Sequence, residues 1–240
     1  MDYKNRSLLG NSLIGVMISG KKIYMATLKK YILALLIALF TLLAVDAIAD
    51  ISSEGTIQIA QFSEMNLDDW ENKSFKGETQ YSIQSEEQNS YLHAESMQSA
   101  SALYKKIKVN IHETSFLNWS WRVDKALPKL NEKDKSGDDY AARIYVVFKT
   151  GYTPLSAKAL NYVWSSNDVS DTHWPNAYTK KAIMIPLRSN QDEAGTWQHE
   201  KINIKEDLMQ YIDGVAIMTD ADNSQGTASA SYGDIYFSRN

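Results

Sequence analysis

The feature that most constrains this chain is a recurring pattern of short β-type runs after residue 50. Residues rich in Val, Ile, Thr, Tyr, Phe and Trp form runs of five to nine, and clusters of Gly, Asn, Asp and Ser separate them. Short strands at this spacing predict an all-β, two-sheet antiparallel sandwich rather than a parallel α/β fold. The predicted strands are Thr56–Ala60, Thr79–Gln84, Tyr91–Glu95, Ala102–Val109, Phe116–Val123, Ala141–Lys149, Ala159–Ser165, Lys181–Pro186, Trp197–Ile204, Gly214–Thr219 and Ser229–Phe237.

Helix is scarce in this sequence. Glu206–Ile212 is the best candidate, because acidic residues suit a first helical turn. No repeat, low-complexity tract or Pro/Gly linker divides the chain, so we predict one domain over residues 50–240 and assign residues 1–49 to a leader.

The stretch that begins at Met25 has the pattern of a secretory signal peptide. Two lysines precede an apolar core, Tyr31–Val45, and a small-residue cleavage site, Ala47–Ala49, follows. We therefore predict a true start at Met25, cleavage before Asp50, and a periplasmic or secreted protein. The alternative is an uncleaved anchor, but an apolar run of 15 residues is shorter than the roughly 20 needed to span a bilayer.

Charge and cysteine content narrow the classes of partner. Without the leader, the chain carries 19 Lys and Arg against 27 Asp and Glu, a net charge of −8. Such an acidic surface argues against nucleic acid or anionic lipid as the main partner. There is no cysteine, so disulfides and thiolate zinc sites are excluded.

The segment "SGDDYAARIYVVFK" places charges at the mouth of a strand and inside it. Side chains alternate between the faces of a strand, which puts Arg143 beside Tyr145 and opposite Ile144. A charge inside a sheet is stable only if it is solvated, paired with an opposite charge or bound to a ligand. We predict that a carboxylate from a neighbouring strand pairs with Arg143.

The same alternation sorts the aromatic residues. Trp119 and Trp121 share a face of one strand, and we predict that they belong to the core. Tyr162 and Trp164 share a face of another strand, at what reads as a sheet rim because Ser165 follows at once. We assign these two rings to a ligand surface, with the core as the alternative.

Six segments in order resemble the DUF3047 family of exported bacterial proteins: "LNWSWRVDKALP", "SGDDYAARIYVVF", "ALNYVWSS", "TWQHEKINIKED", "GVAIMTDADNS" and "ASYGDIYF". A weaker resemblance joins "FSEMNLDDWENKSFKGETQYSI" and "YGDIYF" to galactose-binding-like jelly-roll domains, which include many carbohydrate-binding modules. The second resemblance implies a jelly-roll sandwich with an aromatic, polar sheet face for sugars, and often a structural calcium. This is an analogy of fold.

A polar patch with flat rings is the predicted ligand site. It consists of Asp138, Asp139, Arg143, Tyr145, Tyr162 and Trp164. Rings cover the C–H faces of a pyranose, while Asp and Arg exchange hydrogen bonds with its hydroxyl groups. The simpler interpretation is a structural Arg–Asp pair on a solvated face. The long loop between Trp164 and Lys181 is interpreted as a rim or lid beside it.

"TDADNS" offers alternating oxygen ligands, so Asp220, Asp222 and Asn223 are a candidate calcium site outside the EF-hand class. An Asp/Asn-rich turn is the alternative. For catalysis the case is weak. The four histidines lack metal-ligand spacing, nucleotide and hydrolase motifs are absent, and adjacent aspartates diverge on a strand.

The function predicted from sequence is therefore non-catalytic binding of a carbohydrate or another polar ligand outside the cytoplasm. The alternatives are a hydrolase that acts on envelope glycans and a structural envelope protein that docks a protein partner.

Overall fold

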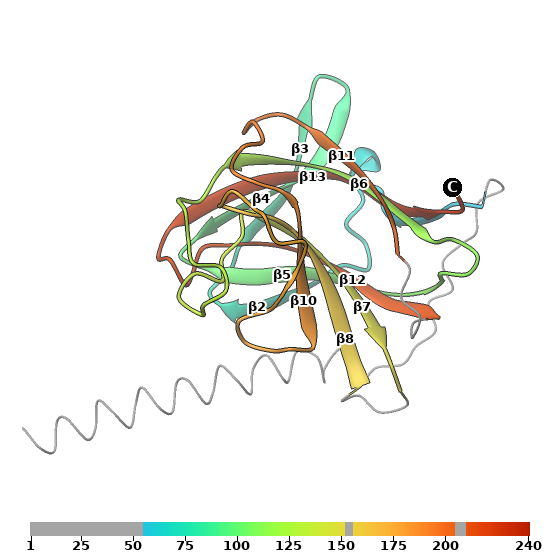
Figure 1. Ribbon diagram of the computed structural model, residues 1–240. Coiled ribbons are helices and arrows are strands. Elements are labelled where there is room, and N and C mark those ends of the chain that lie inside the picture. Colours follow the sequence, from blue (N-terminus) through green and yellow to red (C-terminus); the bar gives the residue numbers. More distant parts are fainter. Residues whose placement is uncertain (1–54, 152–155, 205–209) are drawn as a thin grey trace, which may run out of the picture.

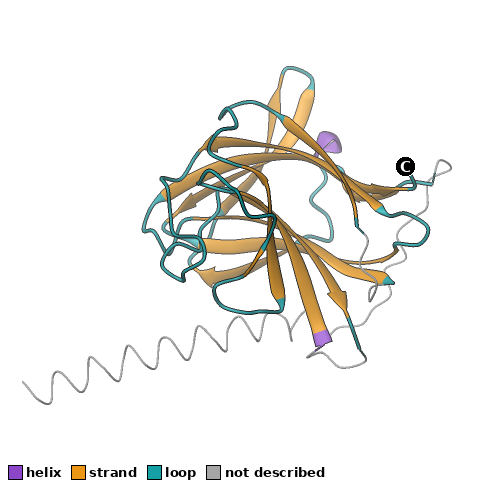
Figure 2. Ribbon diagram, viewed as in Figure 1, coloured by secondary structure: helices purple, strands orange, loops and turns teal. Residues whose placement is uncertain are grey.

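The computed structural model describes residues 55–151, 156–204 and 210–240, which form two packed sheets (Figures 1 and 2). The six-stranded sheet has the order β11-β6-β13-β4-β3, with β1 also paired to β13. Its strands are β1 (Ile57–Ala60), β3 (Gln80–Glu86), β4 (Asn89–Met97), β6 (Phe116–Lys125), β11 (Gln198–Asn203) and β13 (Thr227–Ser238).

The seven-stranded sheet has the order β2-β5-β12-β7-β8-β10-β9. Its strands are β2 (Glu71–Lys76), β5 (Ala100–Asn110), β7 (Ala142–Lys149), β8 (Ala157–Trp164), β9 (Trp174–Pro175), β10 (Ala182–Arg188) and β12 (Tyr211–Asp220). A 3-10 turn, η1 (Phe62–Glu64), lies between β1 and β2.

The predicted all-β sandwich is confirmed, and each of the eleven predicted strands coincides with an observed one. Two strands were missed, β2 and the two-residue β9. One pair departs from the expected antiparallel pattern, because β10 runs parallel to β8. The predicted leader lies outside the described residues. So does most of the predicted helix Glu206–Ile212, whose last two residues begin β12.

The core lies between the sheets and contains a chain of four aromatic rings. Trp119 and Trp121 of β6 are edge to face with centroids 5.4 Å apart. Trp119 lies 5.5 Å from Tyr162 of β8, and Trp121 lies 5.8 Å from Trp164 of the same strand. Because β6 and β8 belong to different sheets, these contacts stabilise the sandwich across its interior.

Burial on the seven-stranded sheet follows the alternation expected of strands. On β7, Ile144, Val146 and Phe148 pack into the core between the sheets. Arg143, Tyr145 and Val147 point the other way, to what we call the outer face of this sheet. Within the described ranges, no helix is long and apolar enough to cross a membrane.

Candidate functional site

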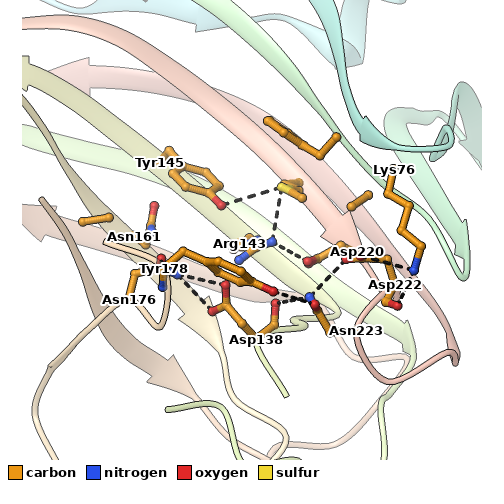
Figure 3. Close-up of a pocket in the computed structure, with 14 residues that line it drawn as sticks. Lys76, Asp138, Arg143, Tyr145, Asn161, Asn176, Tyr178, Asp220, Asp222 and Asn223 are labelled. Atoms are coloured by element: carbon orange, nitrogen blue, oxygen red, sulfur yellow. Dashed lines mark hydrogen bonds and ion pairs between the residues drawn. The ribbon is translucent and has the colours of Figure 1, made fainter. Parts of the chain in front are cut away.

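A pocket of about 110 Å³ opens on the outer face of the seven-stranded sheet (Figure 3). Strands β2, β5, β7, β8, β10 and β12 supply its floor, and the loops before β7, before β10 and after β12 supply its rim. The lining consists of Phe75, Lys76, Ala100, Asp138, Arg143, Tyr145, Asn161, Asn176, Tyr178, Ala182, Met218, Asp220, Asp222 and Asn223.

Small side chains hollow the pocket and rings flank it. Ala100 and Ala182 put only a methyl group on the outer face, so the surface is lower there than at their neighbours. Phe75, Tyr145 and Tyr178 add aromatic surface. An apolar hollow with a few convergent polar groups is the usual form of a small-molecule site.

Arg143 is paired, as predicted, and its partner is Asp220 on the neighbouring strand β12. The guanidinium Nη2 contacts Asp220 Oδ2, and the two side chains are only 4% and 1% exposed. The rings of Tyr140 and Tyr145 lie 5.2 and 5.4 Å from the guanidinium carbon, within cation–π range. Burial lowers the pKa of Arg143, but Asp220, Tyr145, Asp138 and Tyr140 together outweigh burial, so the pKa rises and the guanidinium stays charged.

Two buried polar atoms of the pocket residues have no hydrogen-bond partner within the described part of the chain. They are Nε of Arg143, a donor, and Oδ1 of Asn161, an acceptor. Both residues lie on the outer face and line the pocket, and Asn161 is fully buried. Buried polar atoms are nearly always paired in proteins, so these two atoms call for partners from outside the chain, such as water or a ligand group.

Asp138 carries an unusual charge state. Both of its carboxylate oxygens accept from Asn176 Nδ2 at 3.0 Å. Burial raises the pKa of Asp138 to about 7, although Arg143 and the Asn176 hydrogen bond oppose the rise. Near neutral pH this carboxyl group therefore exchanges between an acceptor and a proton-donating acid.

Asp139 is not part of the pocket, which corrects its assignment as a ligand residue. It is fully buried, and its carboxylate accepts from the backbone N–H groups of Asn223 at 3.0 Å and Ser224 at 2.6 Å. β7 begins only at Ala142, so strand alternation does not extend back to Asp139. Its role is to hold the loop after β12 against the chain before β7.

The assignment of Tyr162 and Trp164 to a ligand surface is also wrong. They face the core and are 3% and 5% exposed, and Trp164 Nε1 donates to the carbonyl of Ser189 at 3.0 Å. The side of β8 that reaches the pocket is the opposite one, with Asn161. Neither ring lines the pocket.

The loop between Trp164 and Lys181 does lie at the rim of the pocket, where Asn176 and Tyr178 come from it. The Tyr178 hydroxyl donates to Asn223 Oδ1 at 2.8 Å, which ties this loop to the one after β12. Sequence reasoning missed eight further lining residues. Asn161 has a visible signal, since it is a polar residue between apolar neighbours; the others are Phe75, Lys76, Ala100, Asn176, Tyr178, Ala182 and Met218.

The structure brings two of the predicted calcium residues together with a third acid. One carboxylate oxygen each from Asp139, Asp220 and Asp222 lies within 4.8 Å of the others. Each carboxylate already has a partner within the protein. Asp139 accepts from the backbone N–H groups of Asn223 and Ser224. Asp220 is paired with Arg143, and Asp222 is paired with Lys76 at 3.6 Å. Asn223 turns its Nδ2 toward Asp139, at 3.0 Å. With its lone pairs so engaged the cluster fits a cation poorly, and calcium stays a prediction.

Comparison with known proteins gives a family match and distant structural likenesses. The sequence model of "Protein of unknown function (DUF3047)" matches residues 68–236. No curated protein sequence matches the chain.

Among solved structures, the family 11 carbohydrate-binding module from Clostridium thermocellum, in complex with a β-1,3-1,4-mixed-linked tetrasaccharide, is 11% identical, with a TM-score of 0.40 over 80% of this chain and 97% of that one. The CBM22-2 xylan-binding domain of Paenibacillus barcinonensis Xyn10C is 10% identical, with a TM-score of 0.34 over 75% and 97%. Likeness at this level is too distant to say what the pocket binds.

Proposed function

The chain belongs to the DUF3047 family, and from that premise we propose that it is a non-catalytic carbohydrate-binding protein whose pocket holds one sugar ring. The observation that carries this proposal is the pair of unpartnered buried atoms, Arg143 Nε and Asn161 Oδ1. A buried polar group without a partner costs about 1–3 kcal/mol. Sugar hydroxyl groups both donate and accept, so they match both types of unpartnered atom.

Shape and charge support the same class of ligand. The rings of Tyr145 and Tyr178 offer flat surfaces for the C–H face of a pyranose. Three carboxyl groups line the pocket, Asp138, Asp220 and Asp222, against two cations, and the pocket gains negative charge as Asp138 ionises near pH 7. This balance favours a neutral ligand over an anionic one. A volume of about 110 Å³ suits a single ring better than a chain.

The test is a thermal-shift screen with neutral monosaccharides and disaccharides, followed by calorimetric titration. A sugar that binds only the native state, at 100 times its Kd, stabilises it by about 2.7 kcal/mol, or roughly 5–11 °C for a chain of this size. Tyr145→Phe removes a hydroxyl whose hydrogen bond, to Met218 Sδ at 3.6 Å, is weak.

We expect Tyr145→Phe to lower affinity at least fivefold with little effect on the unliganded melting temperature. Tyr178→Phe should lower affinity as well, with a lower melting temperature because its hydroxyl joins two rim loops. Tyr211→Phe, at an exposed tyrosine of the same sheet, is the matched control. If no sugar shifts the melting temperature, or if all three variants respond alike, the proposal fails.

A glycan hydrolase that uses the same pocket is the second candidate, because the raised pKa of Asp138 suits a general acid. A glycosidase also needs a second, available carboxylate. Asp220 is bound by Arg143 and by the backbone N–H of Tyr140 at 3.2 Å, so it is poorly placed to attack. Release of reducing ends from a glycan panel, abolished in Asp138→Asn, would reverse this ranking.

Export remains part of the proposal and rests on the sequence pattern from Met25 to Ala49. Amino-terminal sequencing of the protein isolated from the cell envelope or medium should begin at Asp50. A chain that begins at Met25 or earlier would count against cleavage.

A further inference from the structure

The six-stranded sheet has its own groove, on the face turned away from the core. Its volume is about 860 Å³, against about 110 Å³ for the pocket on the other sheet. Residues from η1, β3, β4, β6, β11 and β13 and from the loops beside them line it. Neither the predicted ligand residues nor the proposed sugar pocket includes any of this lining.

One end of the groove is an aromatic cluster held rigid by charges. The rings of Tyr91 and Trp197 are edge to face with centroids 5.5 Å apart. The guanidinium of Arg122 lies over both, 5.3 Å from the Tyr91 ring and 5.0 Å from the Trp197 ring. Glu86 and Asp124 hold Arg122 at 2.9 and 2.6 Å. A surface fixed in this way loses little conformational entropy when a ligand binds.

The other end carries Tyr236, which pairs in register with Asn118. Gln198 pairs with Trp121 in the antiparallel register of β11 and β6. Trp197, one residue earlier, therefore lies opposite Arg122. Four residues along β6 separate the two levels, roughly 14 Å at about 3.4 Å per residue. A ligand that touches both Trp197 and Tyr236 is therefore longer than one sugar ring.

Between the two ends the surface is kept flat. Gly233 and Ser120 both line the groove, and a Cβ on Gly233 would collide with Ser120 Oγ. A side chain at this glycine would therefore fill the middle of the groove. Half-buried rings at both ends of a flat, polar stretch give a surface on which successive sugar rings can lie.

The charges of the lining select against an acidic partner. Four acidic side chains line the groove, Glu86, Glu87, Glu200 and Asp234, against two basic ones, Arg122 and Lys201. A polyanion would meet net repulsion here. Carboxylate, amide and imidazole groups along the lining can exchange hydrogen bonds with hydroxyls of an uncharged chain.

We infer that this groove is a second carbohydrate site, which binds the interior of a linear, uncharged glycan chain that crosses β6 diagonally, from Trp197 beside β11 to Tyr236 of β13. The inference is independent of the pocket on the seven-stranded sheet, because the two sites share no residue. With both sites occupied, one molecule holds a single sugar ring on one face and a glycan chain on the opposite face.

Calorimetric titration of the full-length protein tests the inference, with cellohexaose, xylohexaose, laminarihexaose and chitohexaose as probes and the matching disaccharides for comparison. We expect at least one hexasaccharide to bind at least tenfold more tightly than its disaccharide. Trp197→Ala and Tyr236→Ala should each weaken that hexasaccharide at least tenfold. Tyr145→Phe, in the pocket, should leave it unchanged, as should Tyr211→Ala on the other sheet.

Several results would overturn the inference. They are no hexasaccharide binding, equal binding of disaccharide and hexasaccharide, tighter binding of polygalacturonate than of the neutral chains, or hexasaccharide binding that Tyr145→Phe alone removes. Melting temperatures show whether each variant is folded. If Trp197→Ala does not fold, His199→Ala replaces it, since His199 lines the groove, is exposed and pairs with Ser120 in register. Its expected loss of hexasaccharide affinity is at least threefold, and no loss would contradict the groove.

Discussion

Replacing Arg143 by methionine tests whether this buried cation is structurally required. Arg143 and Asp220 are 4% and 1% exposed, so the variant leaves a carboxylate buried without its counter-charge. Removing one partner of a buried ion pair costs about 3–5 kcal/mol. For a chain of this size that corresponds to a fall in melting temperature of roughly 6–20 °C.

The loss should depend on pH, and the sign follows from Asp220. Burial raises the pKa of this carboxyl, Arg143 opposes the rise, and Asp138, Asp139 and Asp222 add to it. Without Arg143 the folded-state pKa climbs further above the unfolded value. A group with a raised folded pKa supports stability at low pH and loses that support as pH rises. Arg143→Met should therefore be less damaging at pH 5 than at pH 8.

Urea denaturation of the variant and the wild type at both pH values measures the effect. Arg143→Met/Asp220→Asn should recover at least half of the lost stability at pH 8, because no unpaired charge remains. Lys129→Met, at an ion pair whose side chains are 64% and 58% exposed, is the control and should show no measurable change. A loss at pH 8 below about 1 kcal/mol, or one equal at both pH values, refutes the reasoning.

Three further changes test other parts of the site. Asp138→Asn should make the free energy of unfolding depend less on pH between about pH 4 and 7. The reason is that the wild-type pKa near 7 gives stability at low pH that is lost as pH rises through 7. If thermal melts show the same pH dependence in the variant and the wild type, the raised pKa of Asp138 is contradicted. Trp164→Ala should cost about 3–5 kcal/mol of stability in denaturant titrations, as a core truncation does. Calorimetry on the protein that stays folded should show a sugar affinity within twofold of the wild type. A loss of affinity without a loss of stability would show that Trp164 belongs to the ligand site. EDTA should leave the melting temperature unchanged if chain donors satisfy Asp139, Asp220 and Asp222 as described, whereas a fall that calcium restores would establish the calcium site predicted from sequence.

The strands were predictable because their signal is local. Alternation and turn residues locate β7 and β13 without reference to any partner. β2 was not predicted because its sequence, "ENKSFK", is almost wholly polar. An edge strand with an exposed face can have such a sequence. The parallel pairing of β8 and β10 arises from how distant segments meet, which no local pattern records.

The site was predictable only in part, for the same reason. A cation inside a strand had to have a partner, and Arg143 does. Its partner Asp220 was singled out too, but for calcium. Alternation paired Tyr162 with Trp164 correctly but could not show which face of β8 meets the core, since Leu160 and Val163 make both faces apolar. Asn161, a polar residue between apolar neighbours on that strand, lies on the side that lines the pocket.

The residues that line the pocket are distant along the chain, from Phe75 of β2 to Asn223 after β12. At its rim, Asp139 accepts a hydrogen bond from the backbone of Asn223, 84 residues away in the sequence. Contacts of such long range form late on a folding pathway, because loop closure must come first. A sugar added during refolding should therefore leave the folding rate nearly unchanged. It should slow unfolding instead, since ligand contacts absent from the transition state act on that rate, and occupancy would set the lifetime of the folded protein.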